Sequence, residues 1–171
     1  MKLTKEEKEH LESIYQEMLR DEKVQRMKEV PMHRGSNCYL HSFKVAKKAI
    51  KHAQHYKKVD LDALLYAAIL HDYYLYDWRK DKSKLKHHGQ RHPYIAAAQA
   101  RADFNVDELT QTIIKSHMWP INFKEFPKTK EARILSYSDK DIAVIEALSS
   151  KKHKQKKEQK YIDYISRLFD E

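Results

Sequence analysis

An imidazole and a carboxylate stand side by side at the end of an apolar run, where a purely structural helix has no need of them. His71 and Asp72 directly follow residues 63–70, which read Ala-Leu-Leu-Tyr-Ala-Ala-Ile-Leu. Neutral imidazole and ionised carboxylate are good ligands for divalent first-row metals. Neighbouring helical residues point about 100° apart, so both side chains can approach one ion, or Asp72 can bridge to a second.

Such a pair also arises by chance, so support must come from the rest of the chain. Four more polar residues fall at or inside apolar helical segments, where an unpaired polar group is costly. In chain order they are His41, His92, His117 and Asp139. Together with the His-Asp pair, they predict a divalent metal site assembled from several helices.

Each of these four residues also has an ordinary structural explanation. His41 could be a buried histidine bonded to a backbone carbonyl, and His92, which precedes a proline, could cap a helix. His117 could be a cation that favours the negative end of its helix. Asp139 could pair with a nearby basic side chain or cap the next helix. These explanations are independent, and all would have to hold together if there were no metal site.

The order of the residues resembles the HD-domain superfamily of metal-dependent phosphohydrolases, over roughly residues 35–148. The resemblance implies an all-α fold, a single helical bundle with the metal site between its central helices. In that family the first His, the His-Asp pair and the last Asp bind one metal. In dinuclear members the Asp of the pair bridges to a second metal on the two intervening His. The implied metal ligands are His41, His71, Asp72, His92, His117 and Asp139, with Asp72, His92 and His117 as catalytic residues.

The dinuclear pattern is similar to the bacterial HD-domain hydrolases of dinucleoside tetraphosphates. It implies one or two divalent ions (Fe, Mn, Mg, Ni or Zn) and, as partner, a phosphorylated small molecule such as a nucleotide. The expected reaction is hydrolysis of a phosphomonoester or nucleotide phosphoanhydride by attack of a metal-bound hydroxide. One rival is a catalytically degenerate HD scaffold that binds a nucleotide or metal. Another is a basic helical module that binds nucleic acid, with an affinity that falls steeply with salt.

One departure from the family pattern concerns phosphate recognition. Many members follow His-Asp with a short turn and a Lys, whereas this chain continues Tyr-Tyr-Leu-Tyr over residues 73–76. These aromatic side chains could stack on a base or simply pack in the core. Residues 77–91 hold six Lys and Arg against two Asp, a net charge of +4. Since this segment joins two groups of candidate ligands, we expect Arg79, Lys80 and Lys84 to contact phosphate.

Composition favours one all-α domain that is cytoplasmic. The chain has 171 residues, of which 41% are hydrophobic, enough to bury a sizeable core. Two Gly, four Pro and the lack of alternating β-branched runs are typical of helices. One cysteine excludes an intrachain disulfide framework and a Cys-based zinc site. The first residues do not form a signal peptide, and no apolar run approaches the ~20 residues that span a membrane.

Caps and apolar periodicity predict the order of the helices. We expect an N-terminal helix packed on the domain over 1–30, the HD domain over 31–148, and a Lys-rich segment with an amphipathic helix over 149–171. Residues 149–160 hold six Lys and one Glu, which favours a solvated face or linker over nucleic-acid contact. The predicted helices are approximately 4–28, 38–56, 61–74, 92–102, 105–117 or 107–117, 130–138, 141–148 and 161–169.

Overall fold

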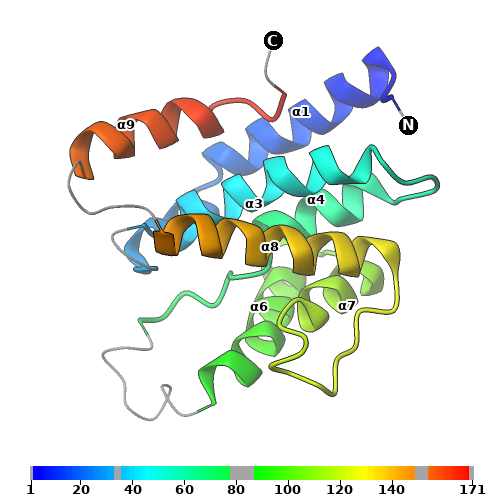
Figure 1. Cartoon of the computed structure of the whole chain (residues 1–171), viewed down its shortest axis with the longest axis vertical. Helices are drawn as coiled ribbons and strands as arrows, with labels where there is room; N and C mark the ends of the chain where they lie inside the picture. The colour runs from blue at the N-terminus through cyan, green and yellow to red at the C-terminus, as the bar shows by residue number, and fades with distance from the viewer. Residues whose placement is uncertain (1, 33–35, 78–86, 149–153, 170–171) are drawn as a thin grey trace.

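The computed structural model describes residues 2–32, 36–77, 87–148 and 154–169, and its architecture is helical (Figure 1). Within these ranges there is no strand, only an isolated antiparallel bridge between Pro31 and Asn37. The predicted all-α fold is therefore confirmed. The elements are α1 (Lys5–Arg20), α2 (Glu22–Gln25), the 3-10 helix η1 (Arg26–Glu29), α3 (Cys38–Ala53), α4 (Leu61–Leu70), α6 (His88–Phe104), α7 (Glu108–Ser116), α8 (Lys130–Leu148) and α9 (Lys154–Ile165).

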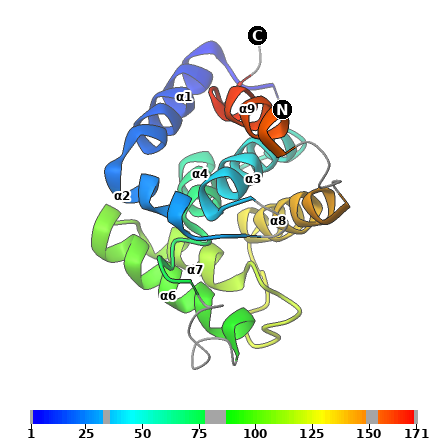
Figure 2. The same cartoon turned by 90° about the vertical axis from the view of Figure 1, so that its left-hand side faces the viewer.

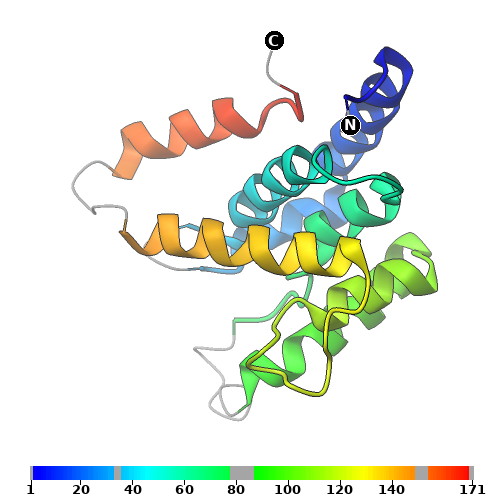
Figure 3. The same ribbon diagram turned by 45° about the vertical axis from the view of Figure 1, so that its right-hand side comes forward.

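The helices form three groups along the molecule (Figure 2). Helices α1 and α9 lie at one end, where the Tyr15 hydroxyl of α1 donates to the carbonyl of Ile165 at the end of α9 over 2.9 Å. Helices α6 and α7 lie at the other end. Helices α3, α4 and α8 lie between them, and α4 is apolar on nearly every side, as expected of a helix enclosed by others. Figure 3 shows α8 crossing the molecule next to both α3 and the α6–α7 end.

The predicted N-terminal helix is longer than the observed one. Helix α1 begins at Thr4, whose hydroxyl accepts from the Glu7 N–H in a capping box, as the sequence predicts. It ends at Arg20 because Asp21 takes an extended conformation and its carboxylate accepts the backbone N–H groups of Lys23 and Val24. An aspartate in this role starts a new helix. The single helix predicted to about residue 28 is therefore wrong.

The two helices predicted between residues 130 and 148 are one continuous helix, α8. Neither Gly nor Pro interrupts this stretch, so the backbone has no reason to leave the helix. The buried side chains follow the seven-residue period of a single inward stripe. That stripe consists of Ala132, Leu135, Asp139, Ile142 and Glu146, and it carries two carboxylates into the interior.

Helices α4 and α6 also differ from their predicted limits. Helix α4 ends at Leu70 rather than near residue 74, and His71 is its C-cap. Helix α6 begins at His88 rather than at His92, so Pro93 lies inside the helix. Because proline has no N–H, the helix lacks the bond that residue 93 would make to the carbonyl of Gly89. His92 is consequently a helical residue and not a cap.

None of the helices in the described ranges is both long enough and apolar enough to cross a membrane. The division into residues 1–30, 31–148 and 149–171 stays a prediction. Helix α9 ends at Ile165, four residues short of its predicted limit, although Leu168 beyond it is buried against the core.

Candidate metal centre

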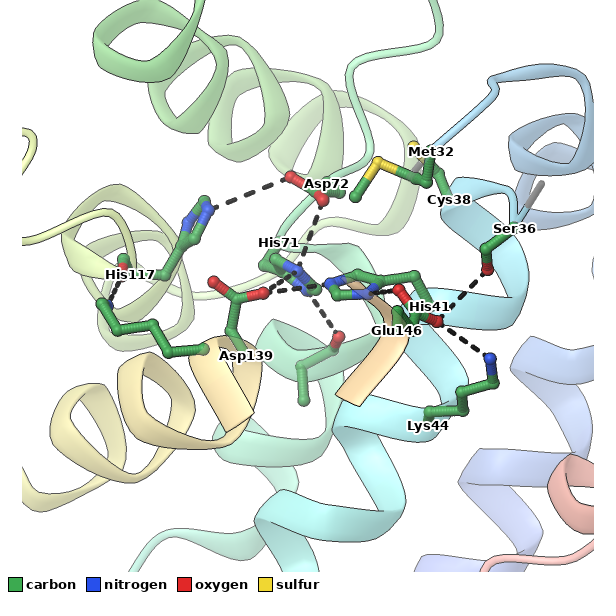
Figure 4. A network of polar contacts seen from close by, with 12 residues as sticks. Met32, Ser36, Cys38, His41, Lys44, His71, Asp72, His117, Asp139 and Glu146 are labelled. Carbon is green, nitrogen blue, oxygen red and sulfur yellow. Dashed lines mark hydrogen bonds and ion pairs between the residues drawn. The ribbon is translucent and has the colours of Figure 1, made fainter. Parts of the chain in front are cut away.

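Five helices bring the six candidate ligands to one place in the interior, and Figure 4 shows all of them but His92 with labels. Two ligands come from within the long helices α3 and α8, one from the second turn of α6, and three from the ends of α4 and α7. All six are at most 9% exposed. The ligands in chain order are His41, His71, Asp72, His92, His117 and Asp139.

One part of the cluster, which we term the first ligand group, consists of His41, His71, Asp72 and Asp139. The His41 Nε2 lies 3.0 Å from Oδ1 of Asp139. The His71 Nε2 lies 3.6 Å from the same oxygen and 3.5 Å from Oδ2 of Asp72. Two imidazoles and two carboxylates that face a common centre form a donor set suited to a divalent metal.

The other part, the second ligand group, consists of Asp72, His92 and His117. The Oδ1 of Asp72 lies 3.2 Å from Nε2 of His92 and 3.9 Å from Nε2 of His117. Since Oδ2 of the same carboxylate faces His71, Asp72 presents one oxygen to each group. This arrangement is the one expected of a carboxylate that bridges two ions.

Three of the imidazoles are held in the same way. The Nδ1 atoms of His71, His92 and His117 each donate to a backbone carbonyl three or four residues earlier, over 2.9, 2.9 and 2.7 Å. A carbonyl can only accept, so Nδ1 carries the proton and Nε2 is directed at the cluster. Hydrogen bonds of this kind orient metal-binding histidines.

The Nε2 atoms fit a cation well. The buried Nε2 of His71 has no hydrogen-bond partner among the described residues. The Nε2 atoms of His92 and His117 lie 3.1 Å apart, although both rings already donate through Nδ1. Two facing lone pairs repel each other, and a bound cation removes that repulsion. A bound metal ion would therefore stabilise this arrangement of imidazoles better than their contacts with one another do.

His41 is supported by side chains rather than by the backbone. Its Nδ1 donates to the Glu146 carboxylate over 2.9 Å. Glu146 also accepts from Lys44 over 2.8 Å and from the Ser36 hydroxyl over 3.2 Å. Burial would raise the pKa of Glu146, but the hydrogen bond and charge of His41, with Lys44, outweigh it and lower that pKa to about 2. The carboxylate is therefore ionised and completes a buried network.

The electrostatics keep the carboxylates charged. Burial would raise the pKa of Asp72 and of Asp139, but the surrounding imidazoles hold both well below the usual range. For His41, hydrogen bonds to two carboxylates overcome burial and raise the pKa to about 10. For His117, burial and the neighbouring histidines lower the pKa to about 3, so this ring is neutral. A neutral ring is ready to bind a metal without losing a proton.

These contacts decide against the ordinary explanations for the individual residues. His41 bonds carboxylates and not a backbone carbonyl, and His117 is not a cation at its helix end. Asp139 caps no helix, because it lies in the middle of α8. The nearby bases have other partners, since Arg133 donates to the carbonyl of Pro127 and Lys140 to Ser136.

A cavity of about 370 Å³ opens onto the ligands and extends to an apolar wall. Tyr74 lines it and is buried, while Tyr73 is buried with its hydroxyl donating to Asp103. These two aromatic residues are therefore core packing, and only Tyr74 borders the site. Five of the six candidate ligands line the cavity, and His71 does not. The other lining residues are Met32, Tyr74, His88, Gly89, Met118, Ile121, Lys140 and Ala143.

The predicted phosphate contacts Arg79, Lys80 and Lys84 lie outside the described residues, so they remain predictions. Sequence reasoning missed two groups at the site, the Glu146 carboxylate and the Lys140 ammonium. Glu146 had a usable signal, because it lies seven residues after Asp139 and so shares its helix face. Lys140 had none, because its direction depends on how α7 meets α8.

Comparison with known proteins agrees with this geometry. The HD-domain family model matches residues 38–143, more than half of the chain, and the matched segment contains all six ligands. No curated protein and no solved structure matches the chain significantly. HD domains bind divalent metals, and the buried His and Asp cluster fits such a site. The chain therefore belongs to the HD-domain family.

Proposed function

We propose that this protein is a metal-dependent phosphohydrolase that cleaves a phosphomonoester or a nucleotide phosphoanhydride. The observation that carries the proposal is the position of Asp72, whose two oxygens face different ligand groups. A shared carboxylate between two sets of imidazoles is the arrangement of two-metal hydrolases. HD-domain proteins are generally hydrolases.

Each residue has a part in the proposed reaction. His41, His71, Asp72 and Asp139 would hold one ion, and Asp72, His92 and His117 would hold a second. Divalent ions in these positions supply an acidified water and neutralise charge on phosphoryl oxygens. Asp72 fixes the separation of the two groups, while the backbone-bonded His92 and His117 keep their Nε2 atoms aimed at the open cavity.

The cavity suits a phosphorylated small molecule. Its lining includes the apolar side chains of Met32, Met118 and Ile121 beside the candidate ligands. Lys140 is a cation at its border, close to Asp139. We propose that a phosphate lies at the ligands, that the rest of the substrate lies along the apolar wall, and that Arg79, Lys80 and Lys84 add phosphate contacts. Dinucleoside tetraphosphates belong in the first set of candidate substrates.

A phosphate-release screen tests the proposal. The purified protein is stripped with chelator and reloaded separately with Mn²⁺, Fe²⁺, Mg²⁺, Ni²⁺ or Zn²⁺. It is then assayed on phosphomonoesters, nucleotides and dinucleoside tetraphosphates. We expect metal-dependent turnover that the Asp72→Ala variant lacks. Metal binding without turnover on every substrate would instead establish the degenerate scaffold that binds a ligand.

A further inference from the structure

His41 differs from the other histidines of the cluster in the group that accepts the hydrogen bond from its Nδ1. Its Nδ1 donates to the Glu146 carboxylate, whereas His71, His92 and His117 donate to backbone carbonyls. Ligation through Nε2 leaves the proton on Nδ1, where Glu146 accepts it. A carboxylate behind a metal-bound imidazole orients the ring and raises its basicity more than a neutral carbonyl does.

Glu146 is fixed firmly enough for this purpose. It is 5% exposed, and its second oxygen accepts from Lys44 and Ser36 (Figure 4). The Lys44 ammonium is itself buried and lies 3.5 Å from the centre of the Tyr161 ring on α9. The carboxylate is thereby held by Lys44 and Ser36 through one oxygen, and its other oxygen accepts from His41.

The charges around the two ligand groups are unequal. The first group contains two carboxylates, Asp72 and Asp139, whereas the second group contains only the shared Asp72. The Glu146 carboxylate behind the first group is itself paired with the Lys44 ammonium over 2.8 Å, and the Lys140 ammonium lies between the groups, next to Asp139 and donating to the carbonyl of His117. A dication is therefore attracted more strongly to the first group.

We propose that Glu146 is a positioning residue that makes the first ligand group the tighter metal site. It acts through His41 and touches neither metal nor substrate. The inference rests on the metal-binding part of the proposed function and does not depend on which substrate is hydrolysed.

The test is a calorimetric Mn²⁺ titration without substrate, made on variants that isolate each group. His92→Ala with His117→Ala leaves the first group, and His41→Ala leaves the second. Adding Glu146→Gln should weaken Mn²⁺ binding about 10- to 100-fold in the first background. In the second background the affinity should stay within about twofold. Equal weakening in both backgrounds, or none in the first, would overturn the proposal.

Glu131→Gln is the matched control, since Glu131 is a buried carboxylate on the same helix that accepts the backbone N–H of Asp60. It should change neither affinity. Because Glu146→Gln leaves the Lys44 ammonium without its counterion, the double variant Glu146→Gln, Lys44→Met removes both charges together. It should restore the melting temperature but not the affinity of the first group. A double variant that binds Mn²⁺ like its background would refute the role of Glu146, whatever the phosphate-release screen shows.

Discussion

The two halves of the metal centre are built on different supports. In the second ligand group, His92 and His117 each bond a carbonyl of their own helix, three or four residues back. In the first group, His41 bonds Glu146, which lies 105 positions further along the chain. The second group is therefore organised by local helix geometry, whereas the first combines a locally held His71 with His41, whose support depends on the packing of α3 against α8.

This difference has a consequence for robustness. A histidine held by its own helix keeps its orientation as long as that helix forms, so it depends little on the rest of the protein. His41 keeps its orientation only while Glu146, Lys44 and α9 stay in place. We therefore expect the first group to bind metal more tightly and to be more sensitive to distant changes.

The most damaging change should be Asp72→Ala, because this residue belongs to both halves. We expect no measurable turnover and weaker binding of both metal equivalents, since each group loses a charged ligand. Phosphate release and calorimetric stoichiometry measure the two effects. An active variant that still binds two ions would show that Asp72 does not link the halves.

Removing only the second half should have a smaller effect. His92→Ala with His117→Ala should leave one metal equivalent and reduce turnover by about 100-fold or more, the scale of losing one strong electrostatic stabiliser. The exposed His55 provides the control, since His55→Ala should change nothing. If the double variant keeps full activity at one equivalent, the second group has no catalytic role.

Metal removal should destabilise the fold, because ions bind the folded chain and not the unfolded one. At a metal concentration of 100 times the Kd the stabilisation is about 2.7 kcal/mol, which corresponds to a melting temperature about 5–10 °C higher than in chelator. Scanning calorimetry measures the shift. The His41→Ala variant should lose more of it than His92→Ala. The reverse order would contradict the ranking of the two halves.

The basic segment over residues 77–91 should affect the binding of substrate and not the binding of metal. Combining Arg79→Ala, Lys80→Ala and Lys84→Ala should raise KM about tenfold, the scale of one lost charge-assisted hydrogen bond, with little change in kcat. Steady-state kinetics on the best substrate measures this. An unchanged KM would mean that the segment is merely solvated and that phosphate is recognised elsewhere.

The smallest expected effect concerns the support that α9 gives to the first half. Tyr161→Leu removes the ring next to the Lys44 ammonium and should lower the free energy of unfolding by about 1 kcal/mol. Metal affinity should fall slightly at the first group and not at the second. Chemical denaturation and Mn²⁺ titration together measure both. A weaker second group would show that α9 supports the whole centre instead.

Much of this protein follows from local sequence. Caps such as Thr4, Asp60 and Asp107 and the apolar periodicity predict most helices, because these signals act over one or two turns. The six candidate ligands can be recognised in the sequence because an unpaired polar side chain in an apolar segment is costly. Their order is enough to indicate the HD family, which the family comparison shows.

Other features were decided only by the tertiary structure. The facing Nε2 atoms of His92 and His117 depend on how α6 meets α7. The support of His41 by Glu146 joins residues that no local signal connects. Sequence alone can indicate which side chains would bind a metal, but the chain must fold before their supports and their charges are set.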